Sequence, residues 1–65
     1  MNYRWFLVRE KYRVDGEERN FRCAVWANSG EDALKRFRGF YPHAINVTAE
    51  ETDQDIAEGF RVKIR

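Results

Sequence analysis

Residues 3–27 read YRWFLVREKYRVDGEERNFRCAVWA, and this stretch decides the fold. Two runs rich in aromatic and β-branched residues, 3–14 and 19–27, flank the segment Asp15-Gly16-Glu17-Glu18. Asp-Gly between two such runs is a strong short-range signal for a β-hairpin. The stretch therefore predicts two antiparallel strands joined by a loop of about four residues.

A helix is expected directly after the hairpin. Ser29 is a favourable N-cap, and Asp32 stands three residues later, where an acidic side chain suits both the cap and the helix dipole. Gly39 is expected to end this helix, and Pro42 prevents its return. The apolar residues Ala33, Leu34 and Phe37 recur at helical spacing and define the face that packs on the sheet.

The remaining chain predicts two more strands. Residues 44–48 and 60–65 both alternate apolar and polar side chains, and the acidic stretch 49–59 between them is expected to be a loop with room for a helical turn around Ile56. The element order is then ββαββ in one domain, residues 1–65. Antiparallel hairpins with one helix packed on one sheet face make a two-layer α+β sandwich.

Composition limits the functions that this fold can carry. The chain has 65 residues, of which 43% are hydrophobic and 35% charged, a globular balance with no room for a second domain or a deep cofactor cleft. The formal net charge of +1 predicts neither a nucleic-acid nor a membrane partner. A lone cysteine and the absence of any long apolar run favour a reducing, cytoplasmic location without a membrane segment.

Strand alternation assigns each side chain to one face of the sheet. The expected core comprises Phe6, Val8, Phe21, Cys23, Val25, Leu34, Phe37, Ile45, Val47, Phe60, Val62 and Ile64. The opposite, open face then collects seven of the twelve cations with the aromatic rings of Tyr3, Trp5 and Trp26. The predicted binding residues on this face are Trp5, Arg9, Lys11, Arg13, Arg22, Trp26, Arg61, Lys63 and Arg65. Glu10 alone breaks the pattern, because it falls on the inward side.

An open face of cations and rings is compatible with several functions. Our first expectation is a non-catalytic protein-interaction module, such as a regulatory subunit, adaptor or inhibitor, that uses this face to bind a protein partner or a second copy. The alternative is RNA or single-stranded DNA binding, in which cations neutralise phosphates and rings stack on bases. Other anionic ligands, a plain solvated face, and a second small core of Trp5, Leu7 and Trp26 beneath the C-terminal segment remain open.

No residue pattern predicts catalysis. His43 follows a proline and has no partner evident in the sequence, and Cys23 lies on the inward side of its strand. The position of Ser29 at the expected start of the helix is explained by N-capping, so it does not indicate a nucleophile. The acidic residues 50–55 lack the spacing of a calcium loop. We therefore expect no enzyme activity, no metal site and no small-molecule cofactor.

Overall fold

The computed structural model describes residues 2–65, which form four strands and two helices. The elements are β1 (Arg4–Val14), β2 (Glu17–Ala27), α1 (Gly30–Phe40), β3 (Val47–Glu51), α2 (Gln54–Glu58) and β4 (Lys63–Ile64). The α+β class is confirmed, but the order is ββαβαβ, because the acidic stretch expected to be a loop contains α2.

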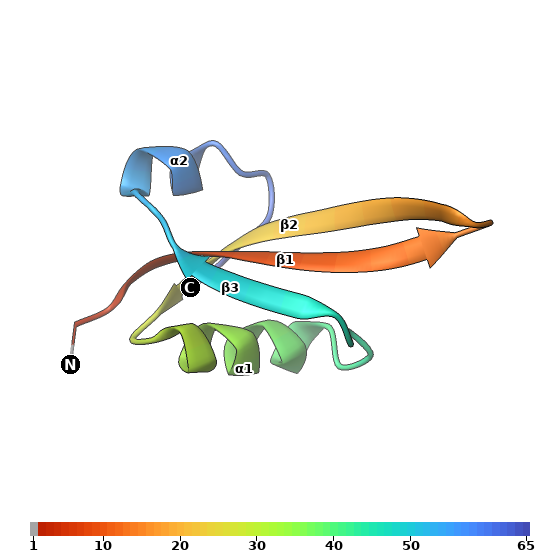
Figure 1. The fold of residues 1–65 in the computed structure, drawn as a ribbon. Coiled ribbons are helices and arrows are strands. Elements are labelled where there is room, and N and C mark those ends of the chain that lie inside the picture. The colour runs from red at the N-terminus through yellow and green to blue at the C-terminus, as the bar shows by residue number, and fades with distance from the viewer. Residues whose placement is uncertain (1) are drawn as a thin grey trace.

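The four strands form one mixed sheet in the order β3-β1-β2-β4 (Figure 1). β1 pairs antiparallel with β2 and with β3, whereas β4 pairs parallel with β2. The prediction of antiparallel hairpins alone is therefore wrong for β4. Because β3 and β4 lie at opposite edges of the sheet, the chain between them must cross one face, and α2 lies on that crossing.

The β1–β2 hairpin closes more tightly than the sequence suggested. Its loop is only Asp15-Gly16, since Val14 and Glu17 are already paired. Asp15 (φ 52°) and Gly16 (φ 81°) both have positive φ, as the two central residues of a type I′ turn require. This turn matches the twist of the strands, so β1 and β2 continue as a ribbon of eleven residues each.

The predicted cap of α1 is confirmed. Ser29 is extended (φ −161°, ψ 167°), and its hydroxyl oxygen accepts a hydrogen bond from the Asp32 amide at 3.0 Å. Gly39 does not end the helix, which continues to Phe40 and is capped by Tyr41. The proline that follows explains the end, because a residue before proline is driven out of the helical region.

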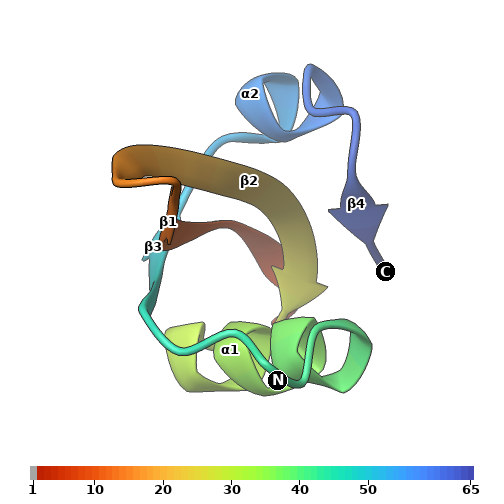
Figure 2. The ribbon, with the colours of Figure 1, turned by 90° about the vertical axis from the view of Figure 1, so that its right-hand side faces the viewer.

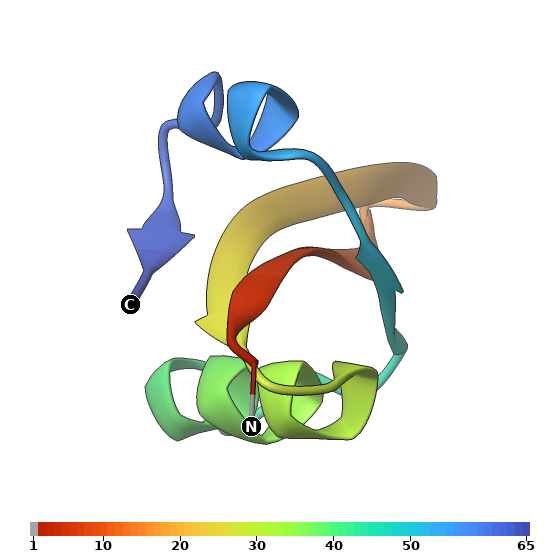
Figure 3. The same ribbon diagram turned by 90° about the vertical axis from the view of Figure 1, so that its left-hand side faces the viewer.

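The two helices cover opposite faces of the sheet, as the two side views show (Figures 2 and 3). On one face, α1 packs over a core whose fully buried members include Val8, Cys23, Val25 and Phe37. On the other face, Ala57 of α2 packs against Trp5 and Ala24, with Trp26 and Phe60 partly buried beside them. The prediction of a two-layer sandwich with one helix is therefore wrong: one end of the sheet has a helix on each face.

Two residues of the expected core lie elsewhere. Ile45 is 87% exposed, because β3 begins at Val47 rather than Ala44 and Ile45 precedes its first sheet position. Phe60 belongs to the cluster under α2, while Val62 and Ile64 reach the α1 side. The predicted strand 60–65 pairs only at Lys63–Ile64, so regular alternation does not extend back to Phe60. Within residues 2–65 neither helix has the length and apolar character to cross a membrane.

Candidate functional site

The β1–β2 ribbon projects beyond the two helices. Residues 11–20 are all exposed, and Figure 1 shows the end of the hairpin extending past α1, α2 and β3. The molecule is correspondingly elongated, with extents of 41 × 22 × 16 Å. Both sides of this ribbon are open to solvent, and the two sides differ in chemistry.

The side that continues the α2 face is basic. Arg9 and Arg22 stand directly opposite each other in the β1–β2 register, and Lys11 is opposite Asn20. Arg9, Lys11 and Arg22 line a shallow hollow of about 560 Å³ that is completed by Glu18, Arg19 and Asn20. Four cations and one carboxylate therefore surround one concavity.

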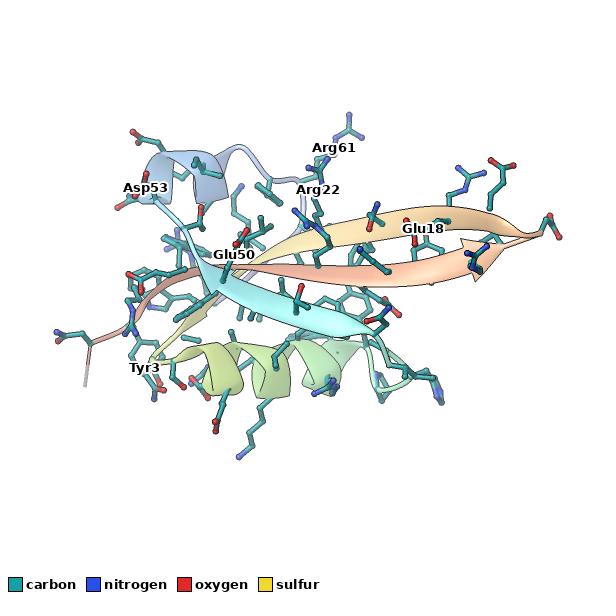
Figure 4. The ribbon with its side chains drawn as sticks, in the orientation of Figure 1. Tyr3, Glu18, Arg22, Glu50, Asp53 and Arg61 are labelled. Atoms are coloured by element: carbon teal, nitrogen blue, oxygen red, sulfur yellow. The ribbon has the colours of Figure 1, made fainter. Side chains whose placement is uncertain are left out.

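A fifth cation joins this surface from the end of the chain. Arg22 and Arg61 line a second hollow of about 300 Å³ together with Gly59 and Phe60. Figure 4 shows Arg22 on β2 and Arg61, after α2, on the same side of the sheet, away from α1. Because Arg22 borders both hollows, the five cations form a continuous surface. We call Arg9, Lys11, Arg19, Arg22 and Arg61 the basic face.

No ion pair neutralises the basic face within residues 2–65. The two ion pairs of that range join Arg4 to Glu51 at 2.9 Å and Arg36 to Asp32 at 2.8 Å, and both lie outside it. The Arg9–Arg22 pair places like charges opposite each other, which destabilises a sheet. The basic face therefore holds a concentration of positive charge that no ion pair within residues 2–65 neutralises, although Glu18 lies among its cations.

The tryptophans do not form the expected open platform. Trp5 is only 4% exposed and lies under Ala57, and the partly buried Trp26 packs against it with ring centroids 5.2 Å apart. The Arg65 guanidinium lies over the Trp5 ring, 5.2 Å from its centroid. The expectation of exposed stacking rings is wrong for Trp5, and the alternative of a second small core describes this pair better.

Two other predicted site residues, Arg13 and Lys63, are exposed but do not line the hollows of the basic face. Arg13 donates a hydrogen bond to the Gly16 carbonyl oxygen at 2.9 Å and is thereby tied to the turn. Lys63 is exposed on β4, where it is in register with Ala24. Neither residue lines the hollows that contain Arg22.

Sequence reasoning missed three charged residues that shape this surface. Strand alternation predicts that Arg19 points to the α1 side of the sheet. The structure instead has Arg19 lining the hollow of about 560 Å³ on the basic side. Its long side chain can reach that side because this end of the ribbon is exposed. Glu18 enters β2 opposite Arg13, and Glu50 lies on β3 opposite Leu7. Each of these carboxylates shares a hollow with a cation of the basic face: Glu18 lines the hollow that contains Arg22, and Glu50 lines a separate hollow together with Arg9.

Two of the three residues considered for catalysis, Cys23 and Ser29, occupy structural positions. Cys23 is fully buried, and burial raises the pKa of its thiol to about 11, so the reactive thiolate is disfavoured at neutral pH. Ser29 is engaged in the cap. His43 is exposed in the turn after α1. Among residues 2–65, no three His, Cys, Asp or Glu side chains are grouped so that they could hold a metal ion.

Comparison with known proteins adds no relative. The chain matches no protein-family model, no curated protein and no solved structure.

Proposed function

We propose that the protein is a non-catalytic module that binds nucleic acid through phosphate contacts on the basic face. The observation that carries this proposal is a set of five cations without ion-pair partners in residues 2–65, grouped around two adjoining hollows. Phosphates supply most of the affinity in such complexes, and they need cations rather than apolar anchors. Four of the five cations are arginines, which form bidentate hydrogen bonds with phosphate.

The chemistry of the basic face favours nucleic acid over a protein partner at this surface. Protein interfaces depend on a few large apolar or aromatic side chains at their centre. The exposed large hydrophobic side chains of residues 2–65 are Tyr3, Tyr12, Val14, Phe40, Ile45 and Ile56. None of them lines the two hollows of the basic face. A polyanion, in contrast, can bind such a surface without them.

The burial of Trp5 under α2 bears on the mode of binding that we propose. Base stacking on Trp5 would require α2 to leave the sheet, because Ala57 packs on that ring. Contacts to the backbone need no such change. We therefore expect binding through the sugar-phosphate backbone, which depends little on base sequence and does not use the ring stacking that the sequence suggested as part of the nucleic-acid alternative.

The test is a titration of a fluorescently labelled single-stranded RNA and of a DNA duplex at low salt, followed by anisotropy. Arg22→Glu should weaken binding by at least tenfold, because it reverses a charge shared by both hollows. Arg38→Glu is the matched control: Arg38 is an exposed cation in the last turn of α1, on the opposite side of the sheet. The proposal would be refuted if both variants lost the same affinity for nucleic acid, or if the wild type did not bind it.

A competitor separates nucleic acid from acidic protein. Unlabelled polyglutamate should displace the labelled RNA much less effectively than unlabelled RNA at equal charge concentration. Displacement by polyglutamate at the same concentration would overturn the nucleic-acid proposal in favour of an acidic protein partner. An interaction with protein, our first expectation from the sequence, is favoured by a different observation on the other side of the ribbon.

A further inference from the structure

The α1 side of the ribbon carries an exposed apolar surface. Phe40 at the end of α1 is 68% exposed, and Ile45 in the following turn is 87% exposed. Tyr12 and Val14 on the projecting part of β1 are each nearly half exposed. We call these residues, with the half-buried Phe21 and Tyr41, the apolar patch.

The patch contains hollows as well as projections. One hollow of about 310 Å³ is lined by Glu10, Tyr12, Phe21 and Tyr41. A second of similar volume adjoins it, because Glu10 and Tyr41 line both, and it is completed by Phe40 and residues 42–44. The rings of Phe21 and Tyr41, which both line the first hollow, meet edge to face with their centroids 5.2 Å apart. A surface with large projecting side chains beside apolar hollows fits a packed partner better than solvent.

The projecting ribbon has a physical need for such a partner. Residues 11–20 have no helix over either side, and a two-stranded hairpin by itself is marginally stable in water. A chain of 65 residues also has little core to spare, and oligomerisation is a common supplement at this size. Covering Tyr12 and Val14 would stabilise the part of the molecule that its own core does not reach.

We infer that the occupant is a second copy of this chain, which docks its apolar patch on the first around a two-fold axis. A two-fold contact requires one surface to complement itself. Here Phe40 lines one of the two hollows, and Ile45 directly follows Ala44, which lines the same hollow, so projections and hollows lie together on one surface. The net charge of +1 adds little repulsion between two copies, and the basic face lies on the other side of the ribbon. The charge that the contact must accommodate is the Glu10 carboxylate, which lines both hollows.

The size of the patch predicts a weak dimer. Its exposed side chains offer on the order of 400–500 Å² of apolar surface per copy, given about 150–250 Å² for a whole aromatic side chain. Two such surfaces bury about 800–1,000 Å² in total, at the lower limit of specific interfaces. The dimer should therefore form in a concentration-dependent manner rather than as a permanent unit.

Sedimentation velocity of the nuclease-treated full chain, from about 5 to about 500 µM, tests the inference. The wild type should shift from the monomer towards the dimer sedimentation coefficient across this range, and the shift should persist when the salt concentration is doubled. The double variant Phe40→Ser, Ile45→Ser should stay monomeric. Both side chains are mostly exposed, so the variant should keep its fold, which circular dichroism checks.

Ile56→Ser is the matched control, because Ile56 is 51% exposed on α2, on the opposite face of the sheet. It should dimerise as the wild type does. A wild type that remains monomeric at the highest concentration would overturn the inference. A double variant that still dimerises would do the same, as would an Ile56→Ser variant that loses the dimer equally. None of these readouts depends on nucleic-acid binding.

Discussion

Neutralising Arg22 should flatten the salt dependence of nucleic-acid binding without destabilising the fold. Each phosphate neutralised by a cation contributes about −0.7 to the slope of log affinity against log salt for single strands, and about −0.9 for duplex DNA. Five cations on the basic face therefore predict slopes of about −3.5 and −4.5, respectively. Arg22→Gln removes one contact, so its slope should be shallower by about 0.7 for single strands and 0.9 for duplex.

These slopes correspond to large changes in affinity. Raising the salt concentration fourfold, from about 50 to about 200 mM, should weaken single-strand binding about 100-fold and duplex binding about 500-fold. Anisotropy titrations at four salt concentrations measure the slope for the wild type, Arg22→Gln and the control Arg38→Gln. The control should keep the wild-type slope, because Arg38 lies on α1 and outside the basic face.

The stability of the same variant separates a binding role from a structural one. Arg22 stands opposite Arg9, and like charges at opposed positions of two strands repel each other. Arg22→Gln should therefore unfold at the same urea concentration as the wild type or at a slightly higher one. A wild-type slope near zero, or a slope that Arg22→Gln leaves unchanged, would refute the reasoning about phosphate contacts.

Three further predictions concern the fold. Ser29→Ala should lose the hydrogen bond to the Asp32 amide and about 1 kcal/mol of stability, and an unchanged urea midpoint would remove the cap assignment. Phe37→Ala deletes a fully buried ring that packs 4.8 Å from the Tyr41 ring centroid. Its cost of about 3–5 kcal/mol matches what a core of this size supplies, so circular dichroism should show loss of cooperative unfolding, and a wild-type transition would contradict this. The pKa of Cys23 is about 11 in the folded chain against 9.0 as the reference, so the unfolded state loses its proton first as pH rises. Between pH 8 and pH 11 the wild type should therefore lose about 2–3 kcal/mol more than Cys23→Ala in urea unfolding, and an equal loss in both proteins would disprove the linkage.

Local signals in the sequence predicted the elements whose cause is local. The hairpin at Asp15-Gly16 and the Ser29 cap depend on backbone conformation within a few residues. Residue type alone predicted both, although the hairpin loop has two residues rather than about four as expected. Alternation also assigned Cys23 and Val25 correctly to the core under α1. These predictions did not require knowledge of which strand lies beside which.

The sequence did not predict the features that depend on how the chain crosses the sheet between β3 and β4. The parallel pairing of β4 with β2 and the position of α2 follow from a connection between opposite edges, which no local pattern specifies. One signal was nevertheless present. Residues 5–8 and 23–27 are continuous apolar runs rather than alternating ones, a pattern typical of strands buried on both faces. It indicates that Trp5 lies under a second cover rather than on an open surface.

Strand alternation predicted four of the five cations of the basic face, namely Arg9, Lys11, Arg22 and Arg61, but it did not predict where the tryptophan rings lie. Arg9, Lys11 and Arg22 depend only on strand alternation, which holds along the paired ribbon. Arg19 was missed because a long side chain at an exposed strand edge is not confined to the face that alternation assigns. The position of Trp5 depends on α2, which is separated from it by about fifty residues of chain.

The ribbon projects past both helices, so its outer part differs from the helix-covered part in the free energy needed to break the backbone hydrogen bonds. Backbone amides of the paired residues near the turn are protected by the hairpin ladder alone, so their hydrogen exchange should proceed by local fraying. Amides around Val8 and Val25, which are enclosed from both sides, should exchange only when the whole chain unfolds. A ligand held by Arg9, Lys11 and Arg22 would then slow exchange in the outer ribbon most, and hydrogen-exchange mass spectrometry could map its footprint in the native state.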